Sequence, residues 1–243
     1  MTDSALRVGL IYPSILGTYG DGGNARILAE RARRRGFDAE VVVIDLGATI
    51  PAELDVYTLG GGEDVAQAIA AQSMRGDRGL CLAVEANKPV LAICAAMQLL
   101  GTEYTDATGV RVEGLGLLDV VTSPMGKRAI GEVVEQPLIE GLTQPLTGFE
   151  NHGGRTRLGS GAKPLGRVVV GTGNGDESRV EGAVQGSIIG TYLHGPALAR
   201  NPELADLILS RVLGGLEPLE IPGVERLRAE RLASARTGAP GER

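Results

Sequence analysis

Residues 89–101 read PVLAICAAMQLLG, and this stretch decides the fold. The apolar run after Pro89, at 90–93, has the length and composition of a short buried strand. The residues from Cys94 onward predict a helix that ends at Gly101. A strand that passes directly into a helix is the unit from which parallel sheets with covering helices are built.

The residues before this stretch repeat the same unit. Strands are expected at 8–12, 41–44 and 56–59, and helices at 24–35 (with Asn24 as N-cap), 63–74 and 79–86. This alternation predicts an α/β fold, a three-layer domain with a mostly parallel central sheet flanked by helices.

The second half of the chain has a different pattern. Short strands punctuated by Gly, Pro and Thr are expected at 116–121, 129–134, 166–170, 180–184 and 187–192, with a hairpin at 171–176 and a helix at 202–213. They predict additional antiparallel strands in the C-terminal half. We expect one domain over residues 1–214, and a C-terminal extension over 215–243 that forms a peripheral helix or a frayed tail.

The composition narrows the function. With 43% hydrophobic residues in 243, the chain can bury a sizeable core. A net charge of −6 and 3% aromatic residues give no reason to expect nucleic-acid or anionic-lipid binding. Two Cys and two His exclude a disulfide scaffold and a Cys/His zinc cluster, so no metal site is expected. No signal peptide or membrane-spanning run is apparent, which predicts a cytoplasmic protein with reduced thiols.

Cys94 is the candidate nucleophile. It lies where the strand gives way to the helix, between the small residues Ala92 and Ala95, as a tight strand-to-helix turn requires. The N-terminal end of a helix favours the thiolate form of a cysteine placed there. A buried cysteine that only packs is the alternative, and it is the favoured interpretation of Cys81, which has apolar neighbours on both sides.

A thiolate nucleophile needs an acid–base partner, and the chain has two histidines. His194 ends an apolar strand, and strand ends line the ligand crevice of open α/β sheets. His152 lies in a segment, 148–156, that we expect to be a polar loop at the same cleft. Either imidazole could instead be a structural side chain.

Three consecutive glycines, Gly60 to Gly62, follow the strand at 56–59. Their backbone N–H groups, those of Gly61 and Gly62 above all, suit an oxyanion hole together with the N–H of Ala95. A tight turn is the plain alternative. The glycine-rich residues 19–24 fit no nucleotide-binding motif, and the basic run from Arg31 to Arg35 is expected to be a solvated helix face.

These motifs together resemble the class I, triad-type glutamine amidotransferases. Residues 89–101 resemble their nucleophile region, and residues 191–195 (TYLHG) resemble the strand end that carries their catalytic histidine. Within the class, the sequence is most similar to the cobyric acid synthase-like branch, and in that branch to the glutaminase subunits of lipid II isoglutaminyl synthases. This similarity rests on Tyr12-Pro13 with residues 19–24 (YGDGGN), on residues 59–64 (LGGGED) and on residues 148–156 (GFENHGGRT). It runs from about residue 7 to 213 and implies a flavodoxin-like fold.

The sequence departs from the class at two positions. Ala96 stands where most members have Gly, and Pro196 stands where many have a Glu that orients the histidine. The second departure is common in the cobyric acid synthase-like branch. We therefore expect a Cys94–His194 dyad, with a backbone carbonyl as the group that orients His194.

The resemblance implies a glutaminase that passes ammonia to a partner. Arg128 is expected to bind the glutamine carboxylate, with Gln98, Asn151 and His152 as further substrate-binding residues. No cofactor is expected in this chain. ATP and Mg²⁺ are expected on a Mur ligase-like (MurT-type) subunit that amidates the D-glutamate of lipid II at the inner face of the cell membrane, in a heterodimer. Residues 216–243 and the Arg31–Arg35 face are possible docking surfaces for it.

Three other functions remain open at this point. One is a glutaminase for cobyric or cobyrinic acid amidation, although that synthase usually carries its ATP-binding domain in the same chain. Another is a cysteine peptidase or thioesterase on the same scaffold. The third is a non-catalytic binding module in which Cys94 is inert.

Overall fold

The computed structural model describes residues 5–106 and 108–238, and a parallel sheet forms its centre. The strands of this first sheet are β1 (Leu6–Ile11), β2 (Ala39–Ile44), β3 (Val56–Leu59), β4 (Val90–Ile93), β11 (Ala183–Gln185) and β12 (Ile188–Thr191). Their order is β11-β12-β4-β3-β1-β2, and all neighbours are parallel except β11 and β12. The residues of β3, β4 and β12 are buried throughout, because helices cover both faces.

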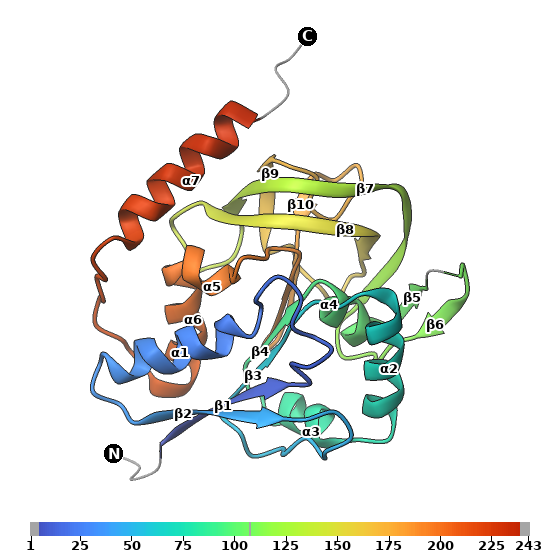
Figure 1. Ribbon diagram of the computed structural model, residues 1–243, viewed down its shortest axis with the longest axis horizontal. Helices are drawn as coiled ribbons and strands as arrows, with labels where there is room; N and C mark the ends of the chain where they lie inside the picture. The colour runs from blue at the N-terminus through green and yellow to red at the C-terminus, as the bar shows by residue number, and fades with distance from the viewer. Residues whose placement is uncertain (1–4, 107, 239–243) are drawn as a thin grey trace.

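The helices lie on two sides of this sheet. They are α1 (Gly23–Arg33), α2 (Asp64–Arg75), α3 (Gly79–Glu85), α4 (Ala95–Leu100), α5 (Ala197–Arg200) and α6 (Pro202–Leu213). On one side α1 packs against α5 and α6, and on the other α2 packs against α4 (Figure 1). The α/β fold with a mostly parallel, helix-flanked central sheet is therefore confirmed.

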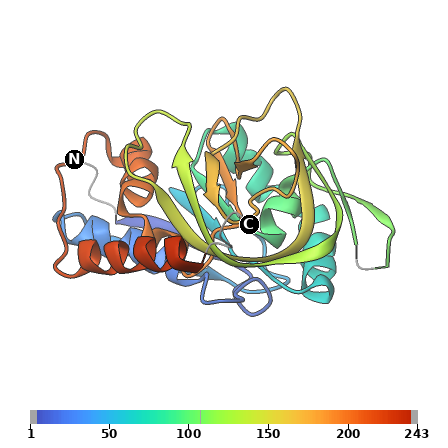
Figure 2. The same cartoon turned by 90° about the horizontal axis from the view of Figure 1, so that it is seen from above.

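A second sheet stands over one end of the first. Its strands are β5 (Glu103–Thr105), β6 (Arg111–Glu113), β7 (Val120–Pro137), β8 (Leu146–Leu158), β9 (Gly166–Val170) and β10 (Val180–Glu181). All pairs are antiparallel except β5 with β7. The long strands β7 and β8 run side by side and curve together, as Figures 1 and 2 show. Antiparallel strands in the C-terminal half, and the hairpin between β9 and β10, are confirmed. The strand expected at 187–192 is β12, which pairs in parallel with β4 in the first sheet, and the strands expected at 116–121 and 129–134 both overlap the long strand β7.

The prediction of a polar loop at residues 148–156 is wrong, because these residues belong to β8. Their polar and glycine-rich composition is not typical of a strand. The strand forms because it pairs with β7, and this long-range pairing cannot be predicted from the local pattern. The two sheets join at the same segment. The N–H of Phe149 donates to the carbonyl of His194 over 3.1 Å, and the N–H of His194 donates back over 3.0 Å.

Two smaller expectations about α1 also need correction. Asn24 does not cap this helix, since its Oδ1 accepts from the N–H of Leu198 and Gly22 stands at the N-cap. Arg31 and Arg35 do not face solvent, since both bind the carboxylate of Asp206 on α6. These two residues therefore link this segment to α6, whereas Arg33 and Arg34 are exposed, as expected for a solvated helix face.

The C-terminal extension forms α7 (Val224–Gly238), which contacts α5, β7 and β8. The buried side chain of Arg228 attaches this helix to the core by donating to the carbonyls of Arg200 and Pro145. Among residues 5–106 and 108–238, no helix has the length and apolar character that crossing a bilayer requires.

Candidate active site

Cys94 lies on a strained turn between β4 and α4. Its φ of 53° and ψ of −109° place a residue with a side chain in a region that glycine favours, at a cost of about 1–3 kcal/mol. The turn is fixed because the N–H of Cys94 donates to the carbonyl of Thr191 on β12, over 2.8 Å. Such a bend raises the sulfur at the carboxyl end of the sheet, in front of the first turn of α4.

His194 follows β12, the strand next to β4, so the neighbouring strand ends bring it to Cys94. Its side chain is 1% exposed. Its Nε2 is buried without a hydrogen-bond partner among the described residues. The sequence-predicted nucleophile and acid–base residue are thus together, and the imidazole keeps one nitrogen for chemistry.

The carboxylate of Asp21 orients His194. Nδ1 of the imidazole lies 2.9 Å from Oδ2 and 3.1 Å from Oδ1 of Asp21. The expectation of a backbone carbonyl in this position is therefore wrong. Asp21 is completely buried and comes from the loop that follows β1. The arrangement is a Cys–His–Asp triad, in which the carboxylate fixes the tautomer and orientation of the ring.

These contacts determine the charge of His194. Burial lowers the pKa of the imidazole, but the hydrogen bond with Asp21 and the interactions with Cys94 outweigh burial and raise it to about 9. At neutral pH the ring is therefore protonated. A protonated imidazole beside the thiol stabilises a thiolate by direct ion pairing.

The glycine turn after β3 closes around this triad. The N–H of Gly61 donates to Oδ2 of Asp21 over 2.9 Å, so the expectation that Gly61 supplies an oxyanion-hole donor needs correction. A Cβ at Gly61 would stand 2.7 Å from Cε1 of His194 and 3.3 Å from Cβ of Cys94. Gly61 is therefore required here, because any side chain would clash with His194. Gly62 and Ala95 line the cleft in front of the thiol and remain the oxyanion candidates.

A cleft of about 200 Å³ opens at Cys94. Drug-sized ligands occupy pockets of roughly 300–1,000 Å³, so this cleft suits a smaller molecule. All four sequence-predicted substrate residues lie in its wall: Gln98, Arg128, Asn151 and His152. The structure thus brings them to the thiol from α4, β7 and β8.

The outer rim of the cleft is a chain of polar side chains. Arg128 donates through Nε to Oδ1 of Asn151 and through Nη2 to its carbonyl. Asn151 in turn donates to the hydroxyl of Tyr19, whose ring lies edge-on to His194 with centroids 4.9 Å apart. Arg128 itself is exposed and lines the cleft.

Three residues at or near the site, Asp21, Tyr19 and Glu181, were not expected there from the sequence. Glu181 lies below it, where its carboxylate accepts from the N–H of Tyr192 and the hydroxyl of Thr191. Burial raises the pKa of Glu181 to about 7. For Asp21 and Tyr19 a signal was present, since the segment 19–24 is one of those that carry the resemblance. For Glu181 no local signal exists.

Comparison with known proteins agrees with this geometry. Residues 7–202 match the model of the CobB/CobQ-like glutamine amidotransferase domain. The chain belongs to this family. It is therefore a glutamine amidotransferase.

Three curated relatives differ in how much of their length is shared. The chain is 37% identical to the lipid II isoglutaminyl synthase (glutamine-hydrolyzing) subunit GatD of Staphylococcus aureus, over 89% of this chain and 90% of that one. It is 34% identical to the subunit of the same name from Streptococcus pneumoniae, over 94% of this chain and 89% of that one. Cobyric acid synthase of Brucella abortus is 34% identical over 64% of this chain, but only 32% of its own length.

Solved structures support the fold. A crystal structure of a glutamine amidotransferase superposes with a TM-score of 0.56 at 21% identity, and covers 86% of this chain and 99% of that one. One from Thermotoga maritima gives 0.52 at 16% identity, with 96% and 93% covered. The shared architecture places the site where open α/β sheets bind ligands, outside the carboxyl ends of the strands.

Proposed function

We propose that this chain is the glutaminase subunit of an enzyme that amidates lipid II, and that Cys94, His194 and Asp21 carry out the hydrolysis. The observation that carries the proposal is the buried Asp21–His194 pair beside a strained cysteine that faces a small polar cleft. A binding module has no need of a strained cysteine with a protonated imidazole beside it.

The first half of the reaction releases ammonia. The thiolate of Cys94 attacks the side-chain amide carbon of glutamine, and the N–H groups of Ala95 and Gly62 stabilise the negative oxygen. The C–N bond then breaks, and His194 gives its Nε2 proton to the departing nitrogen. With a pKa of about 9, His194 holds that proton at neutral pH. Ammonia leaves, and a thioester remains on Cys94.

The second half restores the thiol. Neutral His194 removes a proton from water, and the resulting hydroxide attacks the thioester carbon. The C–S bond breaks and glutamate leaves. The protonated imidazole of His194 then again pairs with the thiolate of Cys94. Asp21 keeps the imidazole in place through both halves without itself taking a proton.

Free ammonia is mostly ammonium at neutral pH, so a useful glutaminase passes it directly to an activated carboxylate. Because the sequence matches neither the G-x-G-x-x-G nor the G-x-x-x-x-G-K-[ST] motif, we assign ATP binding to a separate partner. The Staphylococcus and Streptococcus relatives match over about 90% of both chains. We infer from this a Mur ligase-like partner subunit that binds ATP, Mg²⁺ and the D-glutamate of lipid II, and that brings the complex to the inner face of the membrane.

Amidation of cobyric or cobyrinic acid is the second candidate. Its support is the similarity to cobyric acid synthase, but that similarity covers 64% of this chain against 89% for the lipid II relative. The coverage therefore favours lipid II.

Transfer of labelled nitrogen tests the proposal. The chain is co-expressed with a Mur ligase-like subunit from the same genome, and the complex receives glutamine labelled at the amide nitrogen, ATP and lipid II. We expect label in the D-glutamate amide, and none with Cys94→Ala. Label in a corrinoid amide but not in lipid II would support the second candidate, and glutamate release without either product would contradict both acceptors.

A further inference from the structure

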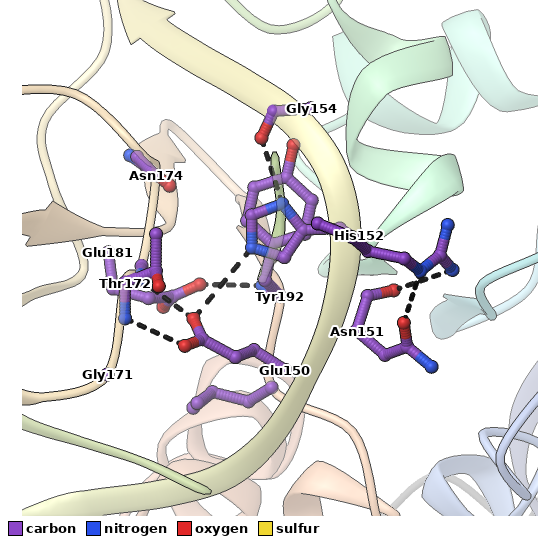
Figure 3. A network of polar contacts seen from close by, with 12 residues as sticks. Glu150, Asn151, His152, Gly154, Gly171, Thr172, Asn174, Glu181 and Tyr192 are labelled. Carbon is purple, nitrogen blue, oxygen red and sulfur yellow. Dashed lines mark hydrogen bonds and ion pairs between the residues drawn. The ribbon is translucent and has the colours of Figure 1, made fainter. Parts of the chain in front are cut away.

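His152 lines the cleft, but its two ring nitrogens face away from it. Nδ1 lies 2.8 Å from the carbonyl of Gly154, which can only accept, so Nδ1 carries a proton and donates. Nε2 is buried and lies 3.8 Å from Oε2 of Glu150. Figure 3 shows both contacts on the inner side of β8. Neither nitrogen is therefore available to hydrogen-bond a molecule in the cleft.

The flat face of His152 is used instead. Its ring stacks on that of Tyr192, with centroids 3.6 Å apart and planes 10° from parallel (Figure 3). Tyr192 is fully buried, and burial raises the pKa of its phenol above the usual value, so the hydroxyl stays protonated. That hydroxyl lies 2.7 Å from Oγ1 of Thr156. The stacked pair is thus anchored at both ends.

Tyr192 connects the stacked pair to Gln98. Nε2 of Gln98 donates to the Tyr192 hydroxyl over 3.0 Å, and Oε1 of Gln98 accepts from Nε2 of Gln67 over 2.9 Å. These bonds hold the amide group of Gln98 in one plane at the cleft. They use one of its two N–H bonds and one of its two acceptor positions. One donor and one acceptor remain at the cleft, one helical turn from Cys94.

The backbone of β8 fits this arrangement closely. A Cβ at Gly154 would stand 2.7 Å from Nε2 of Gln98 and 3.2 Å from the Tyr192 hydroxyl. The carbonyl of the same glycine accepts from His152. Gly154 therefore both holds the imidazole and lets the strand approach Gln98.

We propose that His152 is a positioning residue that holds Gln98 in the glutamine cleft through Tyr192. This refines the expectation that His152 binds substrate directly, and it rests on the proposed glutaminase function. Glu150 completes the support: its carboxylate accepts from the N–H groups of Thr172 and Gly173, which keeps it beside the imidazole. The GFENHGGRT segment is then a scaffold for glutamine recognition.

Steady-state hydrolysis by the full chain, with its partner subunit present, tests the proposal. His152→Ala removes the stacking surface and is expected to raise KM for glutamine about tenfold, with kcat changed less than about threefold. His152→Phe keeps a ring and is expected to stay within about threefold of the unsubstituted KM. If His152 were a ligand through nitrogen, His152→Phe would lose as much as His152→Ala, and the proposal would be wrong.

Tyr192→Phe is the second variant, since it keeps the stack and removes only the hydroxyl that Gln98 uses. It is expected to raise KM about as much as His152→Ala. Iodoacetamide, which needs no glutamine site, should alkylate Cys94 within about twofold of the normal rate in all three variants. A tenfold slower alkylation would show that His152 acts on the catalytic pair instead, and would overturn the proposal.

A double-mutant cycle separates this proposal from the proposed function. In a Gln98→Ala background, His152→Ala should add less than about twofold to KM, whereas independent ligands would multiply their effects. The same cycle measured as melting temperature needs no substrate, and there the two losses should again be less than additive. If the losses in melting temperature are less than additive but the chain releases no glutamate, only the glutaminase function is refuted. If the losses in melting temperature are additive, the positioning role is refuted.

Discussion

The two sheets contribute different parts of the site. The parallel sheet supplies the triad and the glycine turn that packs on it, because Asp21, Gly61, Cys94 and His194 all follow the carboxyl ends of adjacent strands. The antiparallel sheet contributes residues of β7 and β8 to the wall of the cleft. The triad thus lies on segments that follow buried strands, whereas Arg128, Asn151 and His152 lie on a long ribbon and only Gln98 of the four expected substrate residues lies on a helix, α4.

The largest effects are expected from the pair on the parallel sheet. His194→Ala should lower kcat for glutamine hydrolysis about 10,000-fold, nearly as much as Cys94→Ala, and the double variant should lose little more, because the two residues act as a unit. His152→Ala is the matched control, as the other imidazole of the chain. If His152→Ala lost more kcat than His194→Ala, His152 on the antiparallel sheet would be the acid–base residue, and the account would be wrong.

Asp21→Asn should follow, with a loss of about a thousandfold in kcat. Asp21, together with Cys94, outweighs burial and raises the pKa of His194 to about 9, and His194 holds the proton for the departing nitrogen only below that pKa. Activity of the unsubstituted chain should therefore persist up to about pH 9, and the alkaline decline should move toward about pH 6.5 in the variant.

The pH profile of kcat/KM measures this shift. Asp45→Asn, at an exposed carboxylate beyond the end of β2, is the control and should leave the profile unchanged. An unchanged alkaline limb in Asp21→Asn would mean that another group orients the imidazole.

Gly61→Ala should cost about a hundredfold in kcat, because the new Cβ would stand 2.7 Å from His194 and active-site geometry tolerates little displacement. Gly76→Ala has no atom within 4 Å of its new Cβ and serves as the control. Circular dichroism should show both variants folded. Full activity in Gly61→Ala would contradict the close packing of the glycine turn on the triad.

The smallest effect is expected on the antiparallel side. Arg128→Ala should raise KM for glutamine about tenfold and change kcat little, since it removes a charged hydrogen-bond donor from the rim. Lys127→Ala, at the exposed neighbouring residue, should leave KM unchanged. A fall in kcat with KM unchanged would give Arg128 a role in the chemistry instead.

The same division explains what the sequence could predict. Cys94, its strand and its helix are local features, and the helix expected at 202–213 matches α6 in full. The strand β8 could not be predicted from its polar, glycine-rich residues, because pairing with β7 and packing on Tyr192 stabilise it. Asp21 is 173 residues from His194 in the chain. No local pattern reports such a pairing, so the triad became visible only in the fold.

Covalent labelling with the glutamine analogue diazo-oxo-norleucine tests the central claim most directly, since it requires the cleft and the thiolate together. Mass spectrometry of the digested protein should find one adduct, on Cys94 and not on the partly exposed Cys81, and excess glutamine should suppress it. The absence of an adduct on Cys94, or equal labelling of both cysteines, would contradict the account.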